Sequence, residues 1–307
     1  MKRKLMPLVV VIVITISISL PVTGSGAGTQ PSPATQTLST GEHILALMTQ
    51  VNAQLAASSA GYQVDHAEYI TPDDSGEVGQ TVFFNNRGNR QLAAHFVPGD
   101  PRRGGGTNIT YMVDQTEGAI DGLTTAQTTA AIDRAMATWD GANCSTIPIV
   151  GVPSPAEDLG VVEFLNGLGG SPNINADITH TGWLPGGILA PNVIAVTFTF
   201  VFINPDDSLT DIDNNNKADV AFREILYNDA FVWAINANID VETVALHEAG
   251  HGLSQAHFGK LFQTTQNGKF HFAPRAVMNA GYTGVQQGLS GTDNAGHCSI
   301  WGSWPNN

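Results

Sequence analysis

The segment 247–259, HEAGHGLSQAHFG, contains three of the nine histidines of this 307-residue chain, together with one glutamate. His247 and His251 are four residues apart, so on a helix they lie on one face, about 6 Å along the axis from each other. Glycines within and after this pair weaken the helix, so the chain can turn and bring His257 back toward the first two. The spacing therefore predicts a helix over 240–252 and a turn, with three imidazoles converging on one point.

Imidazole nitrogens are typical ligands of zinc, and three protein ligands leave the fourth tetrahedral position open, as a catalytic site requires. Glu248 lies about 100° round the helix from His247, close enough to reach a water on the ion without ligating it. The pattern predicts one catalytic Zn²⁺ held by His247, His251 and His257, with Glu248 as the general base. The alternative is a chance cluster of surface histidines.

This pattern resembles that of the metzincin metalloproteases, HExxHxxGxxH followed by a Met-turn. The three histidines and Glu248 match it position for position, whereas Ser254 stands where the family usually has Gly. That Gly permits a tight turn, so either Ser254 tolerates the geometry or the turn shifts. Met278, in RAVMNAGY, looks like the Met-turn methionine, and a plain core methionine is the alternative. We expect Tyr282, four residues later, to be a core or pocket-wall residue rather than to hold the oxyanion.

Two further stretches are similar to the matrixin branch of that family. ITYMVD followed by AIDRAMATWDG is similar to its first strand and first helix, and LSGTDNAGHCSIWG is similar to its C-terminal helix. The likeness covers about 107–307. It implies an α+β fold, the zincin or metzincin catalytic domain, in which a twisted mixed β-sheet accompanies a first helix, a long active-site helix and a C-terminal helix.

The activity that the resemblance implies is that of a zinc-dependent endopeptidase, which hydrolyses peptide bonds with a zinc-activated water and Glu248 as general base. The peptide or protein substrate would lie extended against an edge strand, for which VIAVTFTFVF at 193–202 is the candidate. The alternative function is a secreted surface or adhesion protein on the same fold, which binds zinc or calcium without catalysis. Glu248 argues against it, because the water needs that residue whereas the metal does not.

The first 27 residues have the order of a secretory signal: a basic start, an apolar run and small residues at the cut. A permanent membrane anchor is the alternative, but the run is short for a span. We therefore expect a signal peptide over 1–27, a secreted, extracellular or periplasmic protein, and no stable membrane insertion after cleavage. Residues 28–106 then form a linker plus a propeptide-like or accessory segment, and PGDPRRGGG marks the boundary to the catalytic domain, 107–307.

The two cysteines, Cys144 and Cys298, favour a disulfide in an exported chain, with two buried free thiols as the alternative. The chain has 13 basic and 27 acidic residues, a formal net charge of −14. Such a surface repels nucleic acid. The expected partners are therefore peptide or protein substrates and no nucleic acid, and we expect a monomer.

A second metal site is a hypothesis for TDIDNNNKAD at 210–219. Asp211, Asp213, Asn215 and Asp219 alternate along this stretch, which lets a tight loop aim oxygens inward. Hard oxygen ligands suit Ca²⁺ rather than zinc. The alternative is a solvated turn rich in Asp and Asn.

Latency has no clear device in the sequence. Matrixins often stay inactive through a propeptide cysteine on zinc, but no cysteine precedes Cys144. FVPGD at 96–100 loosely resembles the aspartate switch of astacin-type propeptides, in which case Asp100 would cover the zinc until cleavage near Arg102 and Arg103. A plain Pro-Gly-Asp-Pro turn is the alternative.

Overall fold

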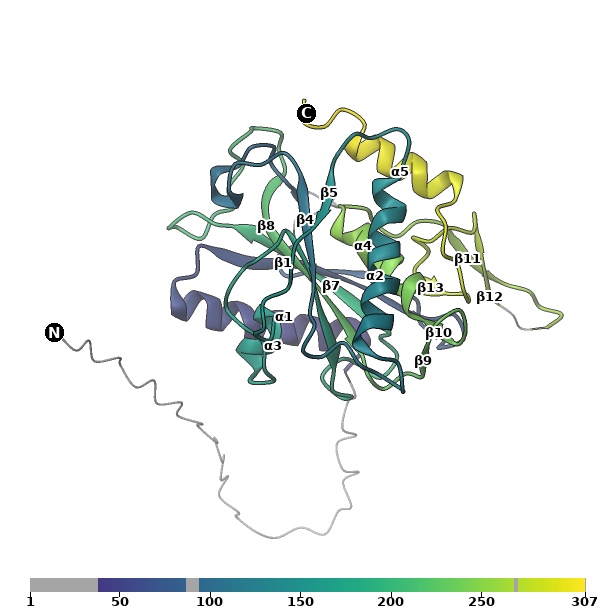
Figure 1. Ribbon diagram of the computed structural model, residues 1–307. Helices are drawn as coiled ribbons and strands as arrows, with labels where there is room; N and C mark the ends of the chain where they lie inside the picture. The colour runs from purple at the N-terminus through teal and green to yellow at the C-terminus, as the bar shows by residue number, and fades with distance from the viewer. Residues whose placement is uncertain (1–37, 87–93, 268–269, 307) are drawn as a thin grey trace, which may run out of the picture. The chain divides into compact units, whose positions relative to one another are not determined.

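The computed structural model describes residues 38–86, 94–267 and 270–306, and the segment from Leu38 onward forms one compact unit. A nine-stranded mixed sheet lies at its centre (Figure 1). Seven strands follow the order β13–β1–β7–β8–β6–β4–β5, while β2 pairs with β1 and β3 with β8. These strands span Tyr62–Pro72 (β1), Thr81–Phe83 (β2), Ala94–His95 (β3), Ile109–Val113 (β4), Ile149–Gly151 (β5), Ile178–Leu184 (β6), Ala195–Phe202 (β7), Ala218–Asn228 (β8) and Gly281–Tyr282 (β13).

The strands β5, β4, β6 and β8 run parallel, whereas β7 is antiparallel to both of its neighbours, β8 and β1. Every residue of β6 and β8 is buried, because helices and loops cover both faces of the sheet. Burial on both faces explains the nearly continuous apolar runs in these segments. The expectation that 193–202 is an edge strand is wrong, since β7 lies inside the sheet and β1 occupies the position beyond it.

Helices cover the two faces of the sheet, which confirms the predicted α+β class (Figure 1). The first and third helices pack with one apolar cluster, and the other three pack with a second cluster on the opposite face. The helices expected over AIDRAMATWDG, at 240–252 and near the C-terminus are all present. The helices are Thr40–Ser58 (α1), Thr125–Asp140 (α2), Val161–Asn166 (α3), Val241–Gly252 (α4) and Gly291–Trp301 (α5), and Pro101–Arg103 form a 3₁₀ turn.

Two small sheets flank the metal-ligand region. β9 (Trp233–Ala234) pairs in parallel with β10 (Ile239–Asp240), just before α4. β11 (Lys260–Gln263) pairs antiparallel with β12 (Phe270–Ala273), between His257 and Met278. The chain thus leaves α4, forms this hairpin, and returns beneath the helix.

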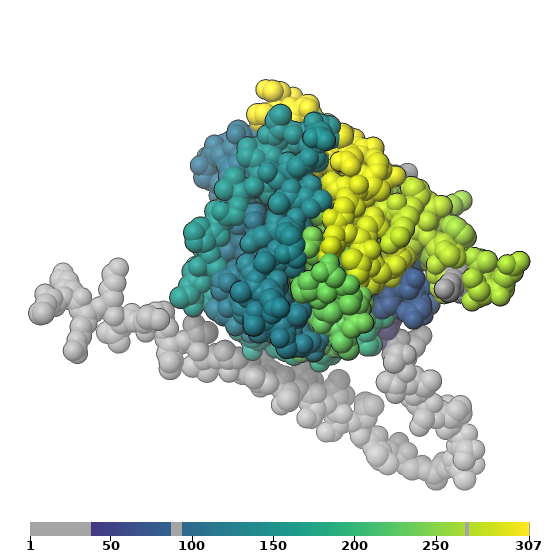
Figure 2. Space-filling model, turned by 45° about the vertical axis from the view of Figure 1, so that its right-hand side comes forward, coloured from purple at the N-terminus to yellow at the C-terminus, as the bar shows by residue number. Residues whose placement is uncertain are grey.

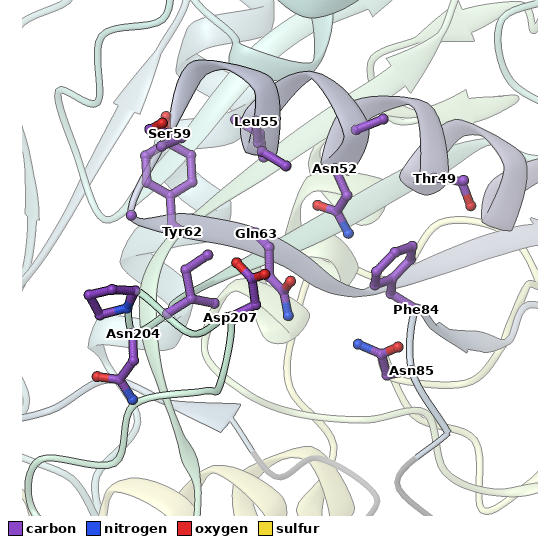
Figure 3. Close-up of a pocket in the computed structure, with 16 residues that line it drawn as sticks. Thr49, Asn52, Leu55, Ser59, Tyr62, Gln63, Phe84, Asn85, Asn204 and Asp207 are labelled. Atoms are coloured by element: carbon purple, nitrogen blue, oxygen red, sulfur yellow. The ribbon is translucent and has the colours of Figure 1, made fainter.

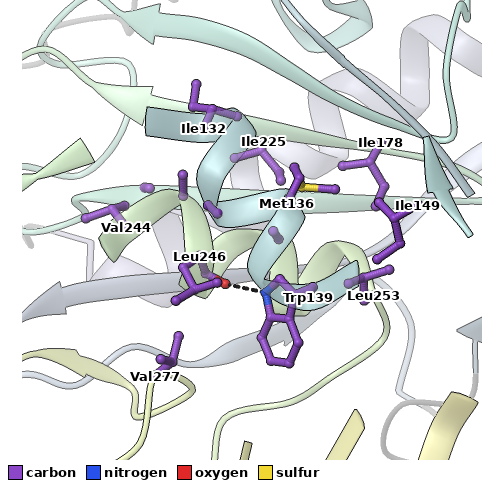
Figure 4. Close-up of a cluster of buried hydrophobic side chains, with 14 of the residues drawn as sticks. Ile132, Met136, Trp139, Ile149, Ile178, Ile225, Val244, Leu246, Leu253 and Val277 are labelled. Atoms are coloured by element: carbon purple, nitrogen blue, oxygen red, sulfur yellow. Dashed lines mark hydrogen bonds between the residues drawn. The ribbon is translucent and has the colours of Figure 1, made fainter. Parts of the chain in front are cut away.

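The apolar core between α2, α4 and the sheet fixes the position of α4 (Figure 4). Trp139 of α2 is fully buried, and its ring nitrogen donates a 2.8 Å hydrogen bond to the backbone oxygen of Leu246 in α4. Burying a large side chain of this kind stabilises a fold by roughly 1.5–3 kcal/mol. The hydrogen bond to a main-chain atom also orients the two helices, so α2 fixes the position of α4 against the sheet.

The predicted disulfide is confirmed: Cys144 and Cys298 are joined, 154 residues apart in sequence. It ties the chain just after α2 to α5. In the chain-entropy account, a closed loop of this length stabilises the fold by roughly 4–5 kcal/mol.

The segment 28–106 was expected to precede the main domain, but its described part shares the sheet with the residues that follow. β1 pairs with β7 over most of its length, and β3 pairs with β8. The expected boundary near residue 106 therefore does not separate two compact units. Among the described residues no helix is both long and apolar enough to cross a membrane. The expected signal peptide, 1–27, lies outside the described residues.

Candidate metal centre

The helix α4 begins with a strong cap, at the start of the predicted helix 240–252. The Asp240 carboxylate accepts hydrogen bonds from the backbone nitrogen of Thr243 at 2.9 Å and from its hydroxyl at 2.6 Å. Glu242 in the first turn pairs with Arg134 of α2 at 2.6 Å. An acidic cap and an acidic first turn both favour a helix N-terminus. All twelve residues of α4 are buried, so its ligand-bearing face is held inside the fold.

The three predicted ligand histidines converge. The Nε2 atom of His251 lies 3.1 Å from Nε2 of His247 and 3.1 Å from Nε2 of His257. The Nε2 atoms of His247 and His257 are 3.2 Å apart. Zinc–nitrogen bonds of about 2.0–2.1 Å in a tetrahedron place ligand nitrogens roughly 3.4 Å apart, close to this spacing. The triad can therefore hold a metal ion, and its geometry is compatible with zinc.

Hydrogen bonds on the far side of the rings direct the Nε2 lone pairs toward one another. Nδ1 of His247 lies 2.7 Å from the Val277 oxygen, and Nδ1 of His251 lies 2.7 Å from the Gln255 oxygen. A carbonyl oxygen only accepts, so both Nδ1 atoms donate and both Nε2 atoms carry lone pairs. Lone pairs facing each other at about 3 Å repel unless a cation lies between them. Backbone contacts of this kind are the usual outer support of metal-ligating histidines.

Burial also favours the neutral, metal-binding form of two of these rings. It lowers the pKa of His247 to about 3, and it lowers the pKa of His257 well below its ordinary value. Burial lowers the pKa of His251 as well, but the Glu68 carboxylate, 3.2 Å from Nδ1, outweighs that effect and raises the pKa. Because a ligating histidine must bind through an unprotonated nitrogen, the first two rings need no proton release to accept a metal.

Glu248 stands beside the triad as predicted, and it is fully buried. Its Oε2 accepts a 2.6 Å hydrogen bond from the Thr197 hydroxyl on β7, while Oε1 has no hydrogen-bond partner among the described residues. Burial raises the pKa of Glu248 to about 7. A carboxyl with such a pKa can both accept and return a proton near neutrality. One oxygen is thus anchored and the other is available for proton transfer.

The turn that contains Met278 lies beneath α4. Met278 is fully buried, and a Cβ built on Gly250 would overlap its sulfur, so Gly250 leaves the room that the methionine fills. The backbone nitrogens of Val277 and Met278 donate to the Asp293 carboxylate at 3.0 and 3.1 Å. Asp293 belongs to the first turn of α5. The expected Met-turn position is therefore a packed floor under the ligand helix, fixed from α5.

The departure at Ser254 has a clear conformational outcome. Ser254 has a φ of 66°, the left-handed region that glycine enters most easily. Its hydroxyl lies 3.1 Å from Nδ1 of His95, which belongs to β3 and is buried. A non-glycine residue in this region costs about 1–2 kcal/mol. Serine thus tolerates the turn geometry, and the turn does not shift.

Tyr282 does not face the ligands with a free hydroxyl. The hydroxyl donates to the Asn238 oxygen at 2.7 Å and accepts from the Asp240 nitrogen at 3.0 Å. The ring lines a small cavity beside His247. Tyr282 is thus a wall residue that positions the start of α4, in line with the expectation from sequence.

The expected calcium loop keeps its carboxylates close together. Ligand atoms of Asp211, Asp213 and Asp219 lie within 4.8 Å of one another, so this group could hold a metal ion. Asp219 is buried and also pairs with Arg102 at 2.7 Å. The Asn215 amide nitrogen lies 2.9 Å from Asp213. A cation here would compete with these contacts, and calcium binding stays a prediction.

The suggested aspartate switch is wrong. The Asp100 carboxylate binds Arg102 through its backbone nitrogen at 2.9 Å and its guanidinium at 2.6 Å. Arg103 in turn pairs with Asp177 at 2.7 Å. The acidic side chain from the N-terminal segment that does reach a ligand histidine is Glu68. No local sequence motif marks Glu68, Thr197 or Asp293, because each acts across a long sequence separation.

A cavity of roughly 910 Å³ lies between α1, the start of β1 and the loop after β7 (Figure 3). None of the three histidines lines it. Its most buried polar side chain is Asn52, which accepts a 2.7 Å hydrogen bond from the backbone nitrogen of Val64 and donates one of 2.8 Å to the backbone oxygen of Val64. The cavity is therefore separate from the candidate metal centre.

No protein-family model matches the chain. A comparison with curated proteins also found no match.

Proposed function

We propose that this chain is an exported zinc-dependent endopeptidase with a metzincin-type, matrixin-like catalytic domain. The convergence of three Nε2 lone pairs next to a buried, half-satisfied Glu248 carboxylate carries the proposal. The floor formed by Met278 and the position of α2, α4 and α5 on one face of a mixed sheet support the zincin type of fold. The disulfide supports an oxidising destination.

The chemistry divides between the metal and Glu248. When bound by His247, His251 and His257, zinc supplies a Lewis acid for a water molecule and for the peptide carbonyl. Glu248 accepts the proton of the attacking water through Oε1 and returns it to the leaving amine nitrogen. Thr197 holds Oε2 during both transfers, so the carboxylate keeps its orientation. The partner is an extended peptide or protein, and the chain acts as a monomer.

The test combines metal analysis with peptide hydrolysis by the purified chain. We expect one tightly held zinc per chain, cleavage of members of a peptide library once the segment that contains β1 has been released by limited proteolysis, and loss of cleavage with a chelator. Glu248→Gln should keep the zinc and lower turnover about 10²–10⁴-fold, the usual contribution of a general base. Glu242→Gln, on the same helix but paired with Arg134, is the matched control and should keep its activity.

Full turnover in Glu248→Gln would contradict the mechanism. Zinc binding without cleavage of any peptide, even after the segment that contains β1 has been released by limited proteolysis, would favour the non-catalytic binding protein. Calcium without zinc would favour a structural surface protein that depends on the loop 211–219.

A further inference from the structure

The strand β1 fills the space between β7 and the segment that follows the Met278 turn. It runs antiparallel to β7 from Tyr62, opposite Phe202, to Ile70, opposite Ala195. Its last residues then run parallel to β13, with Thr71 opposite Gly281. An extended peptide adds to a sheet by pairing with one of its strands. β1 pairs in this way with β7, and its last residues also pair with β13.

Alternate side chains of β1 point toward the candidate metal centre, as the two-residue period of a strand requires. Ile70 is 3% exposed and lines the small cavity beside His247 together with Val277 and Tyr282. Glu68, two residues earlier, places Oε2 3.2 Å from Nδ1 of His251. The strand therefore contacts one ligand histidine, His251, and lines the cavity beside a second, His247.

The register places β1 over the proposed base as well. Glu68 lies opposite Thr197, whose hydroxyl binds Glu248. His247, Glu248 and His251 are at most 1% exposed. A peptide that is to reach these groups along β7 would need the edge that β1 already uses.

The rest of the N-terminal segment holds β1 in place. β2 pairs with its outer edge, and the Thr81 hydroxyl donates to Oε1 of Glu68 at 3.1 Å. On the opposite face of the sheet, α1 packs against side chains of β1 such as Val64. Because of these contacts, exposure of the metal ligands requires that the whole strand β1 is released. Local unfolding of part of β1 is not sufficient.

We propose that β1 is a built-in, substrate-like occupant of the peptide groove of the metal centre, so that the centre is closed to other peptides until β1 is displaced. The inference rests on the proposed function and adds its regulation. Ile70 lines the cavity next to His247, among Val277 and Tyr282, so the groove takes an extended peptide with an aliphatic side chain at that position. An acidic side chain there would lose the apolar contacts with Val277 and Tyr282.

The test cuts the connection between β2 and β3 in the full chain. A recognition sequence for a site-specific protease is inserted after Asn86, and the zinc-loaded intact and cut forms are compared under identical conditions. The probe is a peptide hydroxamate with a leucine side chain at its first position. The apparent affinity for a ligand is lower when only a small fraction of the sites is open. We therefore expect the cut form to bind the hydroxamate at least about tenfold more tightly than the intact form. A chelator should also remove zinc from the cut form faster.

Two additions keep the test decisive. A synthetic peptide of residues 62–72 should displace the hydroxamate from the cut form, and the same peptide with Ile70→Asp should not. In the uncut chain, Ile70→Ala should increase hydroxamate binding and zinc loss. Val64→Ala, in the same strand but buried on the opposite face, should leave both unchanged, which separates groove opening from a general loss of stability.

Equal hydroxamate affinity of the intact and cut forms, or equal behaviour of Ile70→Ala and Val64→Ala, would overturn the inference. Absence of hydroxamate binding in every form would overturn it too, because no peptide groove would then exist. Tighter binding by the cut form without hydrolysis of any peptide would leave the inference standing and refute the proposed peptidase.

Discussion

The Thr197 hydroxyl, on strand β7, donates a 2.6 Å hydrogen bond to Oε2 of Glu248, on helix α4. The bond joins the sheet to the proposed catalytic carboxylate and leaves Oε1 as the free oxygen. Thr197 is also the β7 residue opposite Glu68, the residue of β1 that reaches His251. Thr197 thus connects strand β7 to Glu248, at the position where β1 pairs with β7.

Thr197→Val should lower kcat about tenfold, with little change in zinc content. A hydrogen bond to a charged group contributes roughly 1.5–3 kcal/mol, and about 1.4 kcal/mol corresponds to a factor of ten. Peptide hydrolysis and metal analysis on the same samples measure the effect. Thr199→Val is the control, because the Thr199 hydroxyl is buried on the same strand without a hydrogen-bond partner among the described residues. Equal activity of the two variants would count against the role of Thr197.

Gly250→Ala should destabilise the chain by about 1–3 kcal/mol, the usual cost of overpacking. In an open helix the same change would stabilise by up to about 1 kcal/mol, so the sign is diagnostic. The added methyl group would overlap the Met278 sulfur and lie 3.0 Å from the Trp139 ring. Urea unfolding of the zinc-loaded protein measures the difference. Gly252→Ala, whose added methyl group would come no closer than 3.1 Å to the Ile178 side chain, should cost less.

Replacing both cysteines by serine should lower the free energy of unfolding by roughly 2–5 kcal/mol, the range seen when native disulfides are removed. The bond joins the end of α2 to α5, and neither sulfur contacts a ligand histidine, so zinc should still bind at one ion per chain. Denaturant unfolding with and without zinc is the measurement. An unchanged unfolding midpoint would show that the cross-link does not restrain the unfolded chain.

Stability should fall between about pH 5 and pH 8 because of Glu224. Burial raises the pKa of this carboxyl to about 7, and hydrogen bonds from Val161 and Val162 offset only part of that rise. The ordinary pKa of a glutamate is about 4.3, so the stabilising contribution is complete below that pH and is lost as the pH rises through 7. Glu224→Gln should reduce the difference between the unfolding free energies at pH 5 and pH 8 by roughly 1–3 kcal/mol. Glu157→Gln, at an exposed position, should not.

The ligand set was predictable because it depends on local geometry. Two histidines four residues apart share a helix face in any helix, and the Asp240 cap marks where that helix begins. The sequence left two alternatives for the turn at Ser254, because only the structure shows that this serine adopts the left-handed conformation. Local pattern was thus sufficient for α4 and insufficient for the turn after it.

The surroundings of the site depend on contacts between distant segments. β1 was expected to precede the main domain, yet it takes the place beside β7 that the sequence assigned to a substrate. Eight consecutive residues of β1, from Val64 to Thr71, are buried, and nothing in their local sequence identifies β7 as the partner. Asp293 likewise lies in the first turn of the expected C-terminal helix, and its bonds to the Met278 turn have no counterpart in local spacing. Such pairings require the tertiary structure.

The helix α5 carries Asp293 near its first turn and Cys298 toward its end. A chain emerging from the ribosome would display all three histidines well before this helix exists, yet the methionine beneath them would have no anchor. The floor beneath the three histidines therefore forms last, after α5 has been synthesised. The order of synthesis alone would thus delay completion of the candidate metal centre until the C-terminal helix is in place.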